Sequence, residues 1–433
     1  MRHQRTLLTA LFTLSVMGSP LSCAESRATP APSAARSSQP AVARRGYAEL
    51  LADLDKRIDK LRAAADGRPT DWLIRQNLAA LLFDRAGLTN RVEDFGRVQA
   101  VLDESFALAP KGAGPLSLAA RFNYSIHRLT VAEGYLDQMD KLAIQKPDEK
   151  VSAWVMRGQI ALQRGQYDVA LQHLSNGEKA PADGVELALY HAKTGDPVRA
   201  EALLQEALKT TDTVDPRRRA WLRVQLGLLA LNRGALPEAM ERFQAADDEL
   251  PGWWFVQEQI AQVHELLEEH DDAIAIYEDL VRTDGLPQHI DALAAAYVHR
   301  KQQDKADPLI EQAGKLWDAQ LAEFPDAAMG HGLQHALLFG TPERALELAQ
   351  ANVAVRPGGD AQVGLAKALL KAAKPAEALE VALRTLATPY RTAALHDVAA
   401  QAYEALGQTD NAKEQYRLCY EMNPRYSRLQ HTH

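Results

Sequence analysis

The chain has 433 residues, of which 46% are hydrophobic, 24% charged and 6% aromatic. This composition is sufficient for a folded core, and the low aromatic content argues against an all-β fold. Residues 1–46 carry six Arg and one Glu, so the net charge of −8 leaves −13 on the remaining residues. A folded region this acidic argues against nucleic acid as a partner.

The first 24 residues have the pattern of a secretory signal peptide. Arg2 and Arg5 precede the apolar run Leu7–Met17, which is too short to span a bilayer. Small residues follow at Ser22-Cys23-Ala24, the spacing of a cleavage site. A short buried helix is the alternative interpretation of the apolar run. We therefore expect export to the periplasm of a bacterium.

Residues 25–46 are rich in Pro, Ala and Ser, a composition that cannot form a packed core and predicts a disordered tether. Such a tether is typical of the segment after a lipidated cysteine, and Ser22 is the small residue expected before that cysteine. Pro20 and Leu21 depart from the usual lipoprotein pattern. Lipidation of Cys23, with anchoring to the outer membrane, and ordinary cleavage after Ala24 are both left open.

Residues 47–425 are predicted to fold as helices. Apolar residues at helical spacing predict a capping helix over 47–65, then a long pair over 72–86 and 91–109, and a divergent pair within 115–144. No run of alternating apolar and polar residues predicts a strand. Residues 426–433 are expected to form a polar tail.

The clearest repeated pattern covers residues 220–251. Its marker residues are Leu226 and Gly227 in a first helix, Gly234 in a turn, Ala239, Phe243 and Ala246 on one face of a second helix, and Pro251 at its end. This order and spacing resembles the tetratricopeptide repeat (TPR), a helix-turn-helix unit of about 34 residues. The resemblance implies a right-handed superhelical solenoid in which small residues let the paired helices pack closely.

Alanines equivalent to Ala239 recur along most of the chain. They lie at intervals of 30, 39, 34, 33, 39, 33 and 34 residues, at positions Ala170, Ala200, Ala239, Ala273, Ala306, Ala345, Ala378 and Ala412. The two intervals of 39 coincide with predicted insertions at 210–215 and 317–324. This register predicts an all-α solenoid of about ten TPR-like helix pairs.

Histidine motifs for catalysis are incomplete. His264-Glu265 begins like the helix of zinc proteases, but Glu268 stands where the second histidine is required. His331 and His335 have metal-ligand spacing without the glutamate between them. A third ligand would have to come from a neighbouring unit, from among His289, His299 and His396. We expect no metal and no cofactor.

Other reactive patterns are equally incomplete. Gly359 and Gly364 have the spacing of a phosphate loop but lack its Lys-Ser/Thr pair, so they are interpreted as an inter-repeat turn and a helix contact. Cys419 has no intrachain partner if Cys23 is removed or lipidated, and is expected to behave as a small hydrophobe. We therefore predict no catalytic residues.

The inner face of the superhelix is the remaining candidate for a functional surface. The resemblance assigns this face mainly to first helices, with aligned residues that include Gln159 and Gln163. The Lys/Asn/Arg clamp by which some family members bind a C-terminal carboxylate is missing from the aligned positions.

A cluster of aromatic residues, Trp253-Trp254-Phe255, lies in the middle of the chain. Three adjacent aromatics cannot all enter one helix interface, so at least one is expected to be exposed or inserted between units. The binding hypothesis assigns a peptide site to Trp221, Leu228, Trp253, Trp254, Phe255, Glu258 and Gln262. The alternative is that the aromatic cluster packs between neighbouring repeats.

The resemblance thus implies a non-catalytic protein-protein interaction scaffold that binds a protein or an extended peptide through its inner groove. The apolar leader and the Pro/Ala/Ser-rich tether predict that this scaffold belongs to the bacterial cell envelope. The alternative is an accessory subunit or a metal-dependent enzyme whose site is assembled from scattered residues, with His331 and His335 as the first suspects. The partner, the pathway and the oligomeric state are not encoded in any recognisable motif.

Overall fold

The computed structural model describes residues 46–142, 147–175, 184–212 and 215–426. Within these ranges the chain is helical, and the one β-type pairing there is a bridge between Thr194 and Arg391. The predicted signal peptide (1–24), the tether up to residue 45 and the tail after Tyr426 lie outside the described residues. Within the described ranges, no helix combines the length and the apolar character needed to span a membrane.

A single helix, α1 (Tyr47–Asp66), precedes ten helix pairs in the described ranges. The pairs are α2 (Trp72–Thr89) with α3 (Val92–Leu108), α4 (Leu116–Ser125) with α5 (Leu129–Asp140), α6 (Pro147–Gln163) with α7 (Tyr167–Leu174), α8 (Val185–Lys193) with α9 (Pro197–Thr210), α10 (Pro216–Asn232) with α11 (Leu236–Glu249), α12 (Trp254–Leu266) with α13 (His270–Thr283), α14 (Pro287–His299) with α15 (Gln303–Glu323), α16 (Pro325–Leu338) with α17 (Pro342–Val355), α18 (Gly359–Lys371) with α19 (Pro375–Leu386), and α20 (Ala393–Ala405) with α21 (Thr409–Met422). The predicted all-α solenoid of about ten pairs is confirmed.

Close packing within a pair depends on the small residues of the repeat pattern. In the α10–α11 pair, a Cβ atom on Gly227 would lie only 2.3 Å from the ring of Phe243. Ala239 is fully buried in the same interface, and the other seven recurring alanines are buried as well. The turn between the two helices contains Gly234 at φ +73°, a conformation that side chains with a Cβ atom rarely adopt. The register predicted from the alanine spacing is confirmed.

Two boundaries differ in detail from the sequence-based expectation. The insertion at 317–324 lengthens α15 to 21 residues, so the extra residues are mainly additional helical turns. Tyr426, which the sequence pattern assigned to a polar tail, is buried in a small cluster with Cys419 and Ala393. Packing therefore extends one residue past the predicted end of the solenoid.

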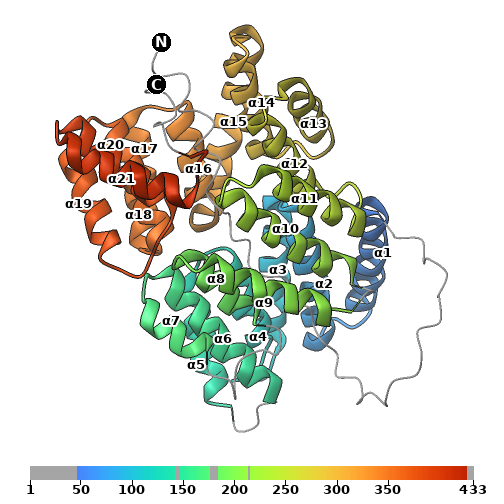
Figure 1. The fold of residues 1–433 in the computed structure, drawn as a ribbon. Coiled ribbons are helices and arrows are strands. Elements are labelled where there is room, and N and C mark those ends of the chain that lie inside the picture. Colours follow the sequence, from blue (N-terminus) through green and yellow to red (C-terminus); the bar gives the residue numbers. More distant parts are fainter. Residues whose placement is uncertain (1–45, 143–146, 176–183, 213–214, 427–433) are drawn as a thin grey trace, which may run out of the picture.

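The solenoid is wound so tightly that successive superhelical turns contact one another. Trp254 Nε1 donates to Leu88 O at 2.7 Å across 166 residues, and Lys193 Nζ donates to Asp360 Oδ1 at 2.7 Å across 167 residues. Asn423 Nδ2 donates to Leu231 O at 3.3 Å across 192 residues. With repeats of about 34 residues, these separations correspond to roughly five to six repeats per turn. In Figure 1, the blue helices α1–α3 accordingly lie beside α10–α12.

Glycines at the start of α18 permit a close approach between the two turns. Gly358 N donates to Gln163 O at 2.9 Å, and Gly359 N donates to Tyr167 Oη at 3.1 Å. A Cβ atom on Gly358 would lie 2.6 Å from Gln163 O, and one on Gly359 would lie 2.2 Å from the ring of Tyr390. The interpretation of Gly359 as belonging to an inter-repeat turn therefore holds, and this turn also joins distant repeats.

Candidate binding cavity

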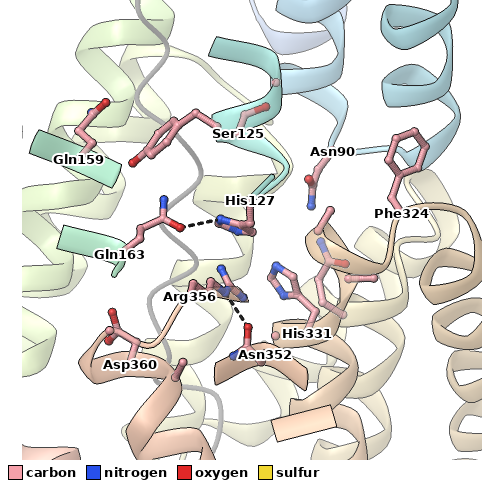
Figure 2. Close-up of a pocket in the computed structure, with 18 of the residues that line it drawn as sticks. Asn90, Ser125, His127, Gln159, Gln163, Phe324, His331, Asn352, Arg356 and Asp360 are labelled. Atoms are coloured by element: carbon pink, nitrogen blue, oxygen red, sulfur yellow. Dashed lines mark hydrogen bonds between the residues drawn. The ribbon is translucent and has the colours of Figure 1, made fainter. Parts of the chain in front are cut away.

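The inner side of the superhelix encloses a cavity of about 250 Å³. Its walls come mainly from the first helices of the pairs, from both superhelical turns, as Figure 2 shows for the polar side. Gln159 and Gln163, which the sequence placed on the inner face, both line it. The cavity exists because the turns touch, so residues far apart in the sequence share one wall.

One side of the cavity is polar. His127 lies in the turn between α4 and α5 at φ +61°, and its Nδ1 atom is 3.0 Å from Gln163 Oε1. Tyr124, just before this turn, is also on the polar wall, and burial raises its pKa to about 12. These groups offer neutral hydrogen-bonding atoms to a ligand.

Arg356 supplies a positive charge on this same polar wall, close to His127 (Figure 2). It follows the last residue of α17, and its Nε atom donates to Asn352 Oδ1 at 2.6 Å. Its guanidinium lies against α16, because a Cβ atom on Gly330 would be 2.3 Å from Arg356 Nη2. No carboxylate oxygen of a described residue lies within 4.0 Å of this guanidinium.

The acids that act on Arg356 from farther away already have cationic partners. Asp360 accepts from Lys193 at 2.7 Å and from Tyr390 Oη at 2.8 Å. Asp326 lies 3.5 Å from the Nε atom of Arg128. Arg356 therefore has an incompletely neutralised charge on the cavity wall.

Burial fixes the protonation states on this wall. Burial lowers the pKa of Arg356 to about 10, which leaves the guanidinium charged at neutral pH. Burial, with the charge of Arg356 as a second cause, lowers the pKa of His331 to about 4 and that of His127 well below its usual value. Both imidazoles are therefore neutral near pH 7, and Arg356 carries the charge among these three residues.

The opposite side of the cavity is aromatic. Trp221, Trp253, Trp254 and Phe255 line it, each with at most 8% of its surface exposed. The indole N–H groups of Trp253 and Trp254 both point to Leu88 O, at 3.4 and 2.7 Å. Of the two outcomes expected for the three adjacent aromatics, exposure or insertion between units, the structure shows insertion, because Trp253 and Trp254 pack against a repeat one turn away and Phe255 packs against both indole rings.

The other three residues of the binding hypothesis lie apart from this wall. Leu228 on α10 packs against the main core cluster, and Gln262 on α12 is partly exposed. Glu258, also on α12, is partly buried, and its burial raises its pKa to about 7. These three residues are not among the residues that line the cavity. The assignment of peptide binding to the whole set stays a prediction.

The histidines suspected from the sequence do not converge. His335 Nδ1 is 2.7 Å from Asp291 Oδ1, whereas His331 stacks on Trp317 with ring centroids 5.7 Å apart. His289 is fully buried beside Trp254, and His396 Nδ1 is 2.8 Å from Gln415 Oε1. Within the described residues, no group of three potential metal ligands includes His331 or His335, so the structure gives no geometric support for a shared metal site there. Cys419 is fully buried, which raises the pKa of its thiol and agrees with a packing role.

Three residues of the polar wall, His127, Asn352 and Arg356, were not singled out from the sequence. They lie in a turn, in a second helix and just after a second helix, whereas the family pattern directs attention to first helices. A sequence signal for Arg356 is its position directly before Pro357-Gly358-Gly359, where the chain must turn. That signal marks a turn but does not indicate which way the side chain points.

Comparisons with known proteins agree with the repeat architecture. The tetratricopeptide repeat model matches residues 393–426, which contain α20 and α21. No curated protein matches the chain. Among solved structures, the chain is similar to yeast Tom70, with 14% identity over 86% of this chain and 89% of that one and a TM-score of 0.38.

Two further structures show the same low similarity. A Rap protein complexed with competence and sporulation factor has 13% identity, covers 81% of this chain and 97% of its own, and gives a TM-score of 0.42. A TPR protein from Parabacteroides merdae has 18% identity, covers 55% of this chain and 91% of its own, and gives a TM-score of 0.34. At such identities and TM-scores, these similarities support no inference about ligands.

Proposed function

We propose that the chain is a non-catalytic interaction scaffold that binds a peptide segment in the cavity on the inner side of the superhelix, here called the axial cavity. A carboxylate of the peptide would pair with Arg356. The observation that carries this proposal is the enclosed guanidinium of Arg356, which has no described carboxylate within 4.0 Å. A charge surrounded by protein is stabilised by an ionised hydrogen-bonding partner. TPR-like repeats generally serve as protein-protein interaction scaffolds, which makes a peptide the appropriate class of ligand.

The size and lining of the cavity favour a peptide segment over a folded domain. At about 250 Å³ the cavity is close to the lower limit for ligand pockets, which is roughly 300 Å³. It therefore accommodates a few residues at most. The aromatic wall would contact an apolar side chain, while His127, Gln163 and Asn352 would bind the backbone or polar groups.

Selection of peptides from a random displayed library would test this proposal directly. Selected peptides should contain Asp, Glu or a free C-terminus, and Arg356→Gln should weaken their binding about ten- to a hundredfold, the value of a charged hydrogen bond. Synthetic peptides with free and amidated C-termini would distinguish the two sources of carboxylate.

Arg344→Gln is the matched control, because Arg344 lies on α17, the helix that Arg356 directly follows, and pairs with Asp318 and Glu347 outside the cavity. It should bind the selected peptides normally. Peptides that bind wild type and Arg356→Gln equally well would contradict the proposal.

We further propose that the scaffold works in the bacterial cell envelope. This rests on the basic and apolar leader of residues 1–24 and on the Pro/Ala/Ser-rich segment 25–46. Cell fractionation with mass measurement of the mature N-terminus tests it. A mature chain that begins at a lipid-modified Cys23 indicates a lipoprotein, whereas cleavage after Ala24 without lipid indicates a soluble periplasmic protein. A cytosolic chain that retains Met1 contradicts export.

The acidic balance of the folded region supports a protein or peptide partner over nucleic acid. The alternative function, an accessory subunit or metal-dependent enzyme built on His331 and His335, is not favoured, because no group of three potential metal ligands in the described part of the chain includes either histidine.

A further inference from the structure

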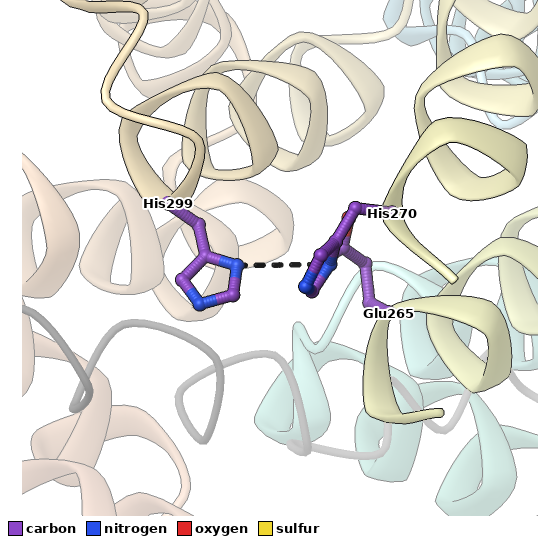
Figure 3. A group of neighbouring side chains, drawn as sticks. All are labelled: Glu265, His270 and His299. Carbon is purple, nitrogen blue, oxygen red and sulfur yellow. Dashed lines mark hydrogen bonds and ion pairs between the residues drawn. The ribbon is translucent and has the colours of Figure 1, made fainter. Parts of the chain in front are cut away.

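Three metal-binding side chains converge at the junction of two successive repeats. Glu265 lies near the end of α12, His270 begins α13, and His299 ends α14 (Figure 3). One ligand atom from each residue lies within 4.8 Å of the others. The sequence suggested His299 only as a partner of His331 and His335; the structure places it beside Glu265 and His270 instead.

The distances within this group, the Glu265–His270–His299 cluster, are close to those of a coordination sphere. Glu265 Oε2 is 3.1 Å from His270 Nδ1 and 4.0 Å from His299 Nδ1. Zinc ligands at about 2.0 Å in a tetrahedral arrangement are roughly 3.3 Å apart. Side-chain rotations that move each ligand atom by less than about an ångström would therefore complete the geometry.

The carboxylate of the cluster is buried and incompletely satisfied. The side chain of Glu265 is 2% exposed, and its Oε1 atom has no hydrogen-bond partner among the described residues. Burial raises its pKa, whereas the hydrogen bond with His270 and the charge of Arg300 lower it. A buried carboxylate oxygen without a donor is costly, and a bound cation would compensate for that cost.

The two histidines keep the cluster open toward solvent. The side chain of His270 is 13% exposed and that of His299 is 29% exposed. An ion could enter from this side, and a water molecule could occupy its fourth position. Two imidazoles and one carboxylate are ligands that suit zinc and other first-row divalent metals better than magnesium or calcium.

We propose that Glu265, His270 and His299 form a zinc site that joins the α12–α13 pair to α14. Bound zinc would connect the turn between α12 and α13 to the end of α14, and so fix the angle between two adjacent repeats. The role is structural, and it is independent of peptide binding in the axial cavity.

A second group, His264, Glu269 and Asp272, lies at the same α12–α13 turn and provides an internal comparison. His264 Nδ1 is 2.6 Å from Glu269 Oε2, but Glu269 and Asp272 are exposed and no second imidazole belongs to this group. Exposed acidic groups are well hydrated and bind transition metals weakly. The two groups therefore make different predictions for substitution.

Zinc titration of the untagged full-length protein after chelator dialysis tests the proposal, and calorimetry measures the binding. In a second experiment Co²⁺ replaces zinc, and visible absorption reports its coordination geometry. Wild type should bind zinc at a site that Co²⁺ can occupy with a tetrahedral spectrum. Glu265→Gln and His299→Ala should each weaken zinc binding by more than about tenfold. Loss of a residue that only hydrogen-bonds to a metal ligand already lowers metal affinity by about ten- to a hundredfold. Saturating zinc should raise the Tm of wild type but not of these two variants.

His264→Ala is the matched control and should retain the wild-type zinc affinity. Circular dichroism of each metal-free variant establishes that it is folded, and the isosteric Glu265→Gln change avoids leaving a hole. Zinc binding that survives both Glu265→Gln and His299→Ala, binding that is lost in His264→Ala, or the absence of saturable binding to wild type would each overturn the proposal.

Discussion

Arg356 and Glu258 are both partly buried in the superhelix, but burial has opposite consequences for their charges. Arg356 keeps a pKa of about 10 and remains charged at neutral pH, so it is available to an anionic ligand. Burial raises the pKa of Glu258 to about 7, and Glu258 forms no ion pair with a described residue. The carboxylate is therefore a source of pH-dependent instability. The sequence predicted Glu258 on the binding surface but could not predict its burial.

Replacement of Glu258 by Gln should change the pH dependence of folding. The pKa of Glu258 is about 7 in the folded chain and 4.5 in its reference state. Between these two pH values the folded chain therefore binds more protons than the unfolded chain. The stability of the wild type falls as pH rises through this window. Above pH 7, Glu258→Gln should be more stable than wild type by on the order of 1–3 kcal/mol, and below about pH 4.5 the difference should vanish.

Urea denaturation followed by circular dichroism across this pH range measures the effect. Glu241→Gln, at an exposed position of α11, serves as the control and should follow wild type. The same pH dependence in Glu258→Gln and wild type would mean that Glu258 is solvated in the folded chain.

Helix pairs are the elements that sequence could predict well. The alanine intervals, the small residue Gly227 and the turn at Gly234 are local features, because each pair is formed by residues less than about 40 positions apart. Short-range patterns are directly visible in one sequence. The same pattern also led to the correct division of 47–142 into a capping helix and two irregular pairs.

Replacement of Ala239 by Leu tests the register at this scale. Ala239 is fully buried between α10 and α11, where Gly227 and Phe243 are already in close contact. The larger side chain should separate the two helices and lower stability by about 1–3 kcal/mol through overpacking. Thermal and urea denaturation measure the loss. Ala319→Leu, at an exposed position of α15, should be almost neutral; equal effects of the two changes would contradict the assigned interface.

At the scale of the whole molecule, the contact between superhelical turns was not predictable from the repeat pattern. Small rotations between successive repeats add up over five to six units, and no local motif records their sum. The polar wall depends on this contact, since Gln163 and Arg356 come from different turns. For the same reason, the sequence identified Trp253 and Trp254 as notable but not their packing against Leu88.

Gly358→Ala should loosen the contact between the turns. The backbone of Gly358, at φ −67° and ψ 169°, is accessible to alanine, but its Cβ atom would lie 2.6 Å from Gln163 O. We expect a loss of about 1–3 kcal/mol and a larger radius of gyration in small-angle X-ray scattering. Gly134→Ala, where nothing lies within 4 Å of the added atom, should not expand the molecule. An unchanged radius and stability for Gly358→Ala would show that the turns do not touch at this point.

The central claim is that a peptide carboxylate binds inside the superhelix at Arg356. Photo-cross-linking tests it most directly, with a selected peptide that carries a photoreactive group next to its carboxylate and with cross-linked residues identified by mass spectrometry. The cavity predicts cross-links to two segments that are distant in sequence, one around His127 and Gln163 and the other around Gly330 and Asn352. Both should disappear in Arg356→Gln. Cross-links confined to helices that do not line the cavity, such as α11 and α19, would contradict the claim.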